Sequence, residues 1–207
     1  HAVVDGGGLA KLREADIKVE VGLLETEARE LNAPYFKRIE TGKPWVIAKW
    51  AMSLDGKIAT RTGHSQWISG ESSRRWVHEL RGRVDAIVVG IGTALADDPL
   101  LTARPAGLRQ ALRVVVDSRL RLPPQSQLAQ TARTVPLLIC AGPKANPANA
   151  VVLESLGCNV WTSPIEDRQQ RLSEMLAMLV QQSSATNILV EGGGELLGGL
   201  FDLHQLD

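Results

Sequence analysis

The sequence predicts an α/β domain in which a mostly parallel sheet carries helices on both faces. From residue 45 onward, short apolar runs typical of strands alternate with amphipathic segments typical of helices. Several runs have no polar face, which is typical of strands covered on both sides. The last run, residues 187–190, leads through Glu191 into glycines 192–194 and then into an apolar helical segment.

The glycine stretch is a candidate anion site. Glycines let the backbone approach a phosphate closely, and the first N–H groups of the following helix are unpaired. By itself the stretch is better explained as a flexible turn, because the full dinucleotide fingerprint is absent. Glu195 is also a poor neighbour for a phosphate unless its side chain points away.

Composition and charge argue against several classes of protein. The 207 residues are 44% hydrophobic and 22% charged, which is typical of one globular domain with a short appendage. The 23 basic residues balance the 23 acidic ones, so no nucleic-acid partner is expected. No apolar run approaches the ~20 residues that span a bilayer, so no membrane partner is expected. Cys140 and Cys158 are expected to be buried free thiols of a cytoplasmic protein, and no metal site is expected.

Residues 1–44 are expected to be an appendage, because Gly42 and Pro44 mark a boundary. The elements expected inside it are short: a helix at 9–16, a strand at 19–21, and a helix at 25–39 that Pro34 kinks or ends.

Residues 45–52 predict the first core strand. Apolar side chains fall on both of its faces, which favours a place in the middle of the sheet. Lys49 lies inside this strand, and a buried lysine needs a partner, water or a ligand for its ammonium group. An edge strand that leaves Lys49 in solvent is the alternative. The apolar flanks favour a functional role.

The next segments are predicted to be a bend and an extended piece at 53–59, a polar loop at 63–70, and a helix. Ser69 or Ser72 can cap this helix, and its buried stripe is expected to hold Trp76, Val77, Leu80 and Val84. After a strand at 86–90, Thr93, Asp97 and Asp98 are expected in a loop that could line a cleft. The alternative is a turn capped by the aspartates.

Later elements follow the same patterns. Strands are predicted at 113–117, 135–140 and 159–161, a helix begins at Asn146-Pro147 and ends at Gly157, and another helix spans 168–182. Ligands of parallel sheets lie at the carboxyl ends of the strands. Lys49 lies within one strand, and Thr93, Asp97, Ser118 and Glu191 lie at or beyond the ends of three others, so one cleft is expected.

Four separated motifs together resemble one known family. They are residues 49–59 (KWAMSLDGKIA), 65–69 (SQWIS), 96–104 (ADDPLLTAR) and 191–194 (EGGG). In this order they are similar to the reductase domain of the bifunctional riboflavin-biosynthesis deaminase/reductase, which has a dihydrofolate-reductase-like fold. The resemblance covers residues 45–207. It implies that residues 1–44 are the end of a deaminase domain and a linker, and that the sheet lacks the strands which the family adds after Asp207.

The deaminase signature, H-x-E followed by P-C-x-x-C, is absent from the sequence. The implied reaction is therefore the reduction of 5-amino-6-(5-phosphoribosylamino)uracil to its ribitylamino product by NADPH. The resemblance implies that Lys49 and Glu191 are catalytic, with Asp97 as a further candidate. The implied substrate contacts are Ser65, Arg81, Leu101, Arg104 and Glu191. The implied cofactor contacts are Ala51, Trp67, Thr93, Asp97, Ser118, Gly193, Gly194, Glu195, Leu196, Leu197, Gly198 and Gly199.

Some points stay open at this level. By position alone, Arg119 or Arg121 could bind the 2′-phosphate that separates NADPH from NADH. The alternatives are a related reductase acting on a diaminopyrimidine ribosylamine or a pterin, and a non-catalytic NADP-binding module. The deaminase half is the expected partner in the full-length protein, and a homodimer is the second partner considered.

Overall fold

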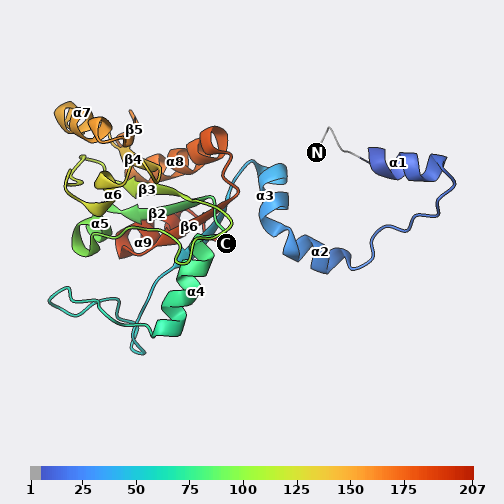
Figure 1. Ribbon diagram of the computed structural model, residues 1–207, viewed down its shortest axis with the longest axis horizontal. Helices are drawn as coiled ribbons and strands as arrows, with labels where there is room; N and C mark the ends of the chain where they lie inside the picture. Colours follow the sequence, from blue (N-terminus) through green and yellow to red (C-terminus); the bar gives the residue numbers. More distant parts are fainter. Residues whose placement is uncertain (1–5) are drawn as a thin grey trace.

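Six parallel strands lie between two layers of helices in the computed structural model, which describes residues 6–207 (Figure 1). The order across the sheet is β1-β6-β2-β3-β4-β5, and all five pairings are parallel. The predicted α/β class, with helices on both faces, is confirmed. The strands are β1 (Trp45–Lys49), β2 (Ala86–Gly90), β3 (Leu112–Val116), β4 (Leu137–Ala141), β5 (Asn159–Thr162) and β6 (Asn187–Glu191).

Each face of the sheet has its own apolar core, because side chains alternate along every strand. On one face Leu189 and its neighbours pack against α5 (Ile91–Asp97), α6 (Gln127–Gln130) and α7 (Pro147–Ser155). On the other face Ile188 and its neighbours pack against α8 (Arg168–Ser183) and α9 (Gly194–Asp202). Both side chains are fully buried, and each such burial contributes roughly 1.5–3 kcal/mol.

Local signals place the later helices where the sequence predicts them. The Asn146 side chain accepts a hydrogen bond from Ala148 N at 3.0 Å, with Pro147 as the first residue of α7. Gly157 follows this helix with φ of 96°, a conformation that glycine adopts without strain. Asp167 caps α8 in the same way, by accepting from Gln170 N at 2.8 Å.

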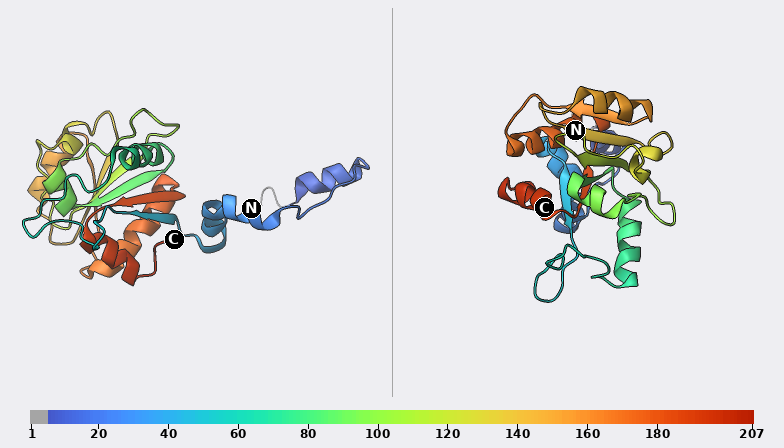
Figure 2. Two further views of the ribbon diagram at one scale, coloured as in Figure 1. Left: turned by 90° about the horizontal axis from the view of Figure 1, so that it is seen from below. Right: turned by 90° about the vertical axis from the view of Figure 1, so that its left-hand side faces the viewer.

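In the amino-terminal appendage, α1 (Gly7–Glu14) and α2 (Glu25–Leu31) lie away from the sheet, whereas α3 (Ala33–Thr41) contacts β1 (Figure 2). The first two helices bury no residue. The helix predicted at 25–39 is broken at Asn32, because Pro34 favours the start of a new helix. The strand predicted at 19–21 is wrong: that segment is irregular and exposed.

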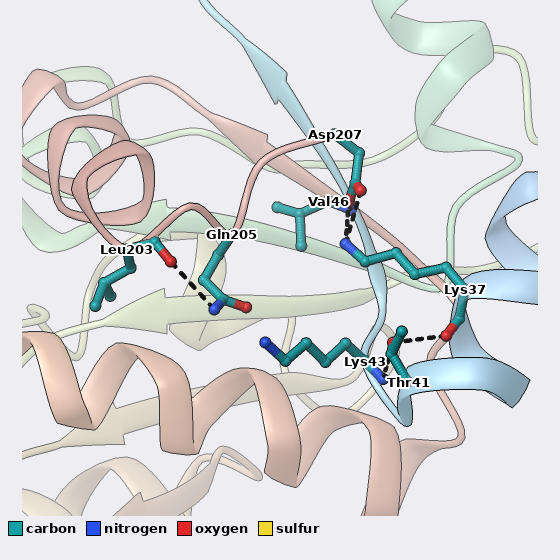
Figure 3. Close-up of polar contacts among 7 residues, drawn as sticks. All are labelled: Lys37, Thr41, Lys43, Val46, Leu203, Gln205 and Asp207. Carbon is teal, nitrogen blue, oxygen red and sulfur yellow. Dashed lines mark hydrogen bonds and ion pairs between the residues drawn. The ribbon is translucent and has the colours of Figure 1, made fainter.

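The first strand, β1, lies at one edge of the described sheet, so its predicted central place is wrong. The apolar side chains of β1 pack instead into both cores and against β6 and α3. Asp207 lies along its outer edge, where Asp207 N donates to Val46 O at 3.0 Å and Asp207 Oδ2 accepts from Val46 N at 2.8 Å (Figure 3). Lys37 Nζ donates to the same carboxylate at 2.7 Å, which ties α3 to β1.

Residues 50–70 and α4 (Glu71–Arg81) project together from the sheet (Figure 1). Residues 53–59 form turns, so the extended piece predicted there is wrong. Neither Ser69 nor Ser72 caps α4; its N-cap is Gly70, without a side-chain bond. Because α4 projects, Trp76 on the predicted buried stripe is 58% exposed.

The segment after β2 is the helix α5, so the predicted loop or turn at Thr93 and Asp97 is also wrong. Ile91 and Ala94 bury its inner face against the core, and this packing fixes the segment as a helix.

Candidate functional site

Lys49 and Glu191 end two neighbouring parallel strands and are partners in register. Residues paired in this way project from the same face of a sheet. Ile47 and Leu189, two positions earlier on each strand, pack in the core that faces α5, so Lys49 and Glu191 project from that face as well. The sequence predicts both residues as catalytic, and the fold brings them together.

Arg81 holds the Glu191 carboxylate with both arms of its guanidinium group. Its Nε donates to Oε1 at 2.6 Å and its Nη2 donates to Oε2 at 2.8 Å. The two side chains are only 12% and 8% exposed. Charge-assisted bidentate bonds of this kind fix the orientation of a carboxylate. The arginine fork expected to contact substrate therefore contacts Glu191 in this structure.

The Leu101–Arg104 segment is attached to α4 through the carbonyl of Thr102. This oxygen accepts from Arg81 Nη1 at 3.3 Å and is 3.0 Å from His78 Nδ1. Leu101, a predicted substrate contact, is buried, and Arg104 is exposed. The fold thus joins Arg81, Leu101 and Glu191 from three separate elements.

His78 is a titratable residue of this cluster that the sequence reasoning missed. Burial lowers its pKa, and the nearby charges of Arg81 and Arg104 lower it further. The Thr102 carbonyl and Glu191 oppose this effect. The neutral ring is therefore favoured, with Nδ1–H facing the carbonyl. The signal that could have found it is spacing, because residues 78 and 81 lie on one face of a helix.

The glycine turn begins beside Lys49, where Gly192 N donates to Lys49 O at 3.1 Å. Gly192 and Gly193 have φ of 68° and 80°, which favour glycine strongly. A Cβ atom on Gly193 would lie 3.3 Å from Thr93 Oγ1, so the hydroxyl of α5 approaches bare backbone. This turn leads directly into α9, and the first N–H groups of a helix are a general binding site for phosphate.

Other predicted cofactor residues lie around this turn in different environments. The Leu196 side chain is buried against α8, and a Cβ on Gly199 would lie 3.0 Å from Leu172. Glu195 points outward, 88% exposed, and its Oε2 is 3.4 Å from Arg168 Nη1. Leu197 is half-buried and Gly194 and Gly198 are exposed.

Ser118 lies past the end of β3, beside a small cavity at the carboxyl ends of β3 and β4. The cavity is lined by Ser118, Trp161, Arg168 and Arg171, with Cys140 at its base. Arg171 Nη2 donates to Ser118 Oγ at 3.3 Å. Burial raises the pKa of the Cys140 thiol to about 12, so this thiol stays protonated and unreactive.

A larger cavity of about 180 Å³ lies behind the Leu101–Arg104 segment. Arg81 and Leu101 line it together with Ile87, Ala111 and Val135, which lie near the amino ends of strands β2 to β4. Neither cavity is lined by Lys49, Thr93, Asp97 or Glu191, so the single cleft expected from the sequence stays a prediction. The candidate residues form a row along the carboxyl ends of the strands, from Lys49 through the glycine turn to Ser118. Arg81 lines the second cavity.

The remaining predicted residues lie farther from this row. Asp97 is exposed at the end of α5, and within residues 6–207 no hydrogen bond or ion pair joins it to Lys49 or Glu191. Ser65 and Ala51 are half-buried in the projecting segment. Trp67 is exposed there, with the Arg74 guanidinium 4.5 Å from its ring centre.

Residues 6–207 contain no group of three or more histidine, cysteine, aspartate or glutamate side chains placed to hold a metal ion. In the same range, no helix is both long enough and apolar enough to cross a bilayer.

Fold and site define an α/β domain with an ionisable cluster and a glycine turn at one edge of a parallel sheet. The chain belongs to the RibD C-terminal domain family, whose model matches residues 44–207.

Relatives from several bacteria are similar over nearly the whole chain. The riboflavin biosynthesis protein RibD of Actinobacillus pleuropneumoniae is 38% identical over 95% of this chain, and that of Aquifex aeolicus is 41% identical over 95%. These matches span 52% and 53% of the two relatives, so the chain spans about half the length of the curated relatives it matches.

Solved structures agree with this assignment. Acinetobacter baumannii RibD (form 1) matches 98% of this chain and 55% of its own with a TM-score of 0.80 at 29% identity. A Thermotoga maritima protein matches 96% of this chain and 53% of its own, with a TM-score of 0.76 at 28% identity. That protein is described as a diaminohydroxyphosphoribosylaminopyrimidine deaminase and 5-amino-6-(5-phosphoribosylamino)uracil reductase.

Proposed function

We propose that this chain is the reductase part of a bifunctional riboflavin-biosynthesis enzyme. It reduces the ribosyl group of 5-amino-6-(5-phosphoribosylamino)uracil to the ribitylamino product with NADPH. The observation that carries the proposal is the pairing of Lys49 with Glu191 at the ends of β1 and β6, next to the glycine turn. Membership of the RibD C-terminal domain family and the Thermotoga maritima relative support the same reaction.

The residues of the glycine turn fit a nicotinamide dinucleotide. Gly192 and Gly193 hold backbone conformations that a Cβ would strain, and Thr93 Oγ1 lies close beside them. We assign the diphosphate to this turn and the adenosine end to the surface beside Ser118, at the carboxyl ends of β3 and β4. When bound, NADPH supplies the hydride for the sugar carbon.

The chain itself supplies orientation and a proton. Both carboxylate oxygens of Glu191 accept from Arg81, so we assign Glu191 to hold ribose hydroxyls rather than to donate the proton. Lys49 is half-buried, and among residues 6–207 no carboxylate pairs with its ammonium group. It is therefore the better candidate to polarise the sugar and deliver the proton.

The same proposal assigns a role to residues 1–44, a partner to the domain, and a cellular compartment. Residues 1–44 are the end of the deaminase domain and the linker, which agrees with the lack of buried residues in α1 and α2 and with the half-length matches. The deaminase half is then the covalent partner that delivers substrate. Cys140 and Cys158, both buried free thiols, suit the reducing cytoplasm.

The test is turnover by the purified protein with NADPH and freshly deaminated substrate, followed by the loss of NADPH absorbance. Lys49→Met should lower kcat by about 10²–10⁴-fold, the usual contribution of a positioned proton donor. Lys43→Met, a matched change at an exposed lysine just before β1, should keep wild-type turnover. Glu191→Gln should raise the KM for substrate. If Lys49→Met and Glu191→Gln both keep full turnover, the catalytic assignment is wrong.

The substrate preference of the protein distinguishes the proposed reaction from the alternative functions. The diaminopyrimidine ribosylamine and a dihydropterin are offered in parallel with the uracil substrate. If either of these is reduced faster than the uracil substrate, the chain has another reductase activity of the same fold. NADPH binding without turnover of any of the three would make it a binding module.

A further inference from the structure

Two arginines of α8 lie beside Ser118 at the carboxyl ends of β3 and β4. Arg171 Nη2 donates to Ser118 Oγ at 3.3 Å, and its Nη1 donates to the carbonyl oxygens of Ile165, at 2.8 Å, and Glu166. These bonds use three of the five N–H groups of a guanidinium. No carboxylate pairs with Arg171 in the part of the chain that the structure describes, so its charge and two donors remain for a ligand.

Gly142 shapes the wall against which Arg171 lies. A Cβ atom at this position would be 3.2 Å from Ser118 O and 3.5 Å from Arg171 Cζ and Nε. Bare backbone therefore lets the guanidinium lie flat beside the turn that carries Ser118. The arginine is held by its neighbours before any ligand binds, which lowers the ordering cost of binding.

Arg168 connects this cavity with the glycine turn. Its Nη1 is 3.4 Å from Glu195 Oε2, and the two side chains are 51% and 88% exposed. An ion pair between such exposed groups is weak, so an incoming anion can displace the carboxylate at little cost. Arg168, Arg171 and Ser118 line one cavity with Trp161, whose ring adds an apolar surface.

The two arginines that follow Ser118 in sequence are arranged differently. The Asp117 carboxylate is fully buried and accepts backbone N–H groups of Arg119, at 3.4 Å, and Leu122, at 2.9 Å. Arg121 Nε lies 3.8 Å from the same carboxylate. Both arginine side chains are exposed, and neither lines the Ser118 cavity.

We propose that Arg168 and Arg171, with the Ser118 hydroxyl, bind the 2′-phosphate of NADPH and so select it over NADH. The proposal rests on the use of a nicotinamide dinucleotide in the proposed function. Guanidinium forks match the oxygens of a phosphate dianion, and two of them with a hydroxyl discriminate strongly against a ribose without phosphate. Arg119 and Arg121, which position alone suggested for this role, are replaced by the α8 pair.

The test is the dissociation constants of NADPH, NADH, 2′-AMP and 5′-AMP for the wild-type protein and its variants. Arg168→Gln and Arg171→Gln should each weaken NADPH and 2′-AMP roughly tenfold or more, which is the usual effect of losing one charge-assisted bond. NADH and 5′-AMP should bind as before. Arg119→Gln and Arg121→Gln remove the same charge from exposed side chains that do not line the cavity, so they should leave the preference for NADPH intact.

Two variants distinguish a specific effect on cofactor binding from a loss of folding. Arg171→Lys keeps the charge without the fork and should fall between wild type and Arg171→Gln. Arg168→Gln touches only an exposed ion pair, so thermal unfolding should be unchanged and its NADPH to NADH ratio decides the question. Equal weakening of both cofactors by Arg168→Gln, or an unchanged NADPH to NADH ratio in this variant, would overturn the proposal.

The cofactor-binding test of this inference and the turnover test of the proposed function can fail independently of each other. A protein that prefers NADPH through these arginines but reduces none of the substrates supports this inference and contradicts the proposed reaction. A protein that reduces the uracil substrate equally well with NADPH and with NADH supports the proposed reaction and contradicts this inference.

Discussion

Arg81 at the end of α4 and Glu191 at the end of β6 form a bidentate ion pair across 110 residues of sequence. The pair fixes the projecting helix to the strand that ends in the candidate catalytic carboxylate. In the proposed function, this pair leaves Glu191 to accept hydrogen bonds from substrate and Lys49 to supply the ammonium group.

The energetic consequence of this pair is testable by a double-mutant cycle. Arg81→Met should lower the free energy of unfolding by about 3–5 kcal/mol, because Glu191 is left charged and buried without its partner. Arg81→Met combined with Glu191→Leu should cost clearly less than Arg81→Met alone. Denaturant unfolding measures all four corners. Additive losses in the double variant would show that the two side chains do not interact.

His78 should make stability depend on pH in the acid range. Its pKa in the folded chain lies below the ordinary 6.5, mainly because of burial. Above 6.5 the ring is neutral in both states. As pH falls below 6.5 the unfolded chain binds a proton that the folded chain resists, so the free energy of unfolding falls through the folded pKa.

His78→Asn should therefore reduce the loss of stability between about pH 7.5 and about pH 5.5, measured by denaturant unfolding at each pH. His64→Asn changes an exposed histidine of the projecting segment and should keep the wild-type slope. A slope that is the same for wild type and His78→Asn would contradict the lowered pKa.

The glycine turn and α5 allow a matched pair of glycine substitutions. Gly193→Ala should lower the free energy of unfolding by about 1–3 kcal/mol and weaken cofactor binding, because φ is 80° and the new methyl meets Thr93 Oγ1. Gly92→Ala lies in a helix with open space around it and should stabilise by up to about 1 kcal/mol. Thermal unfolding and an NADPH titration measure both. Normal binding by Gly193→Ala would exclude the turn as the diphosphate site.

Sequence patterns located five of the six strands to within two residues, whereas the strand predicted at 45–52 ends three residues earlier, at Lys49. Strand β2 has the predicted bounds 86–90, and β6 differs only by including Glu191. Such strands are short apolar runs bounded by glycine or polar residues, so their signal is local. The place of β1 in the sheet was mispredicted because an edge strand covered by α3 and Asp207 has the same apolar pattern as a central one.

The candidate site was predicted in part. Lys49 and Glu191 could be proposed as neighbours because parallel strands end at one edge of a sheet. The Arg81 contact with Glu191 and the α8 arginines beside Ser118 could not, since both depend on how helices far away in sequence pack on the sheet. His78 was missed for the same reason, as its charge environment arises from α4, β6 and the segment after α5.

The pairing of β1 with β6 has one further consequence. Side chains on a strand change face at every residue, so a slip of β1 by a single position would turn the Lys49 ammonium toward α8 and α9. Backbone pairing would survive such a slip, but the ammonium would enter an apolar layer. Insertion or deletion of one residue inside this strand is thus expected to abolish chemistry in a protein that still forms its sheet.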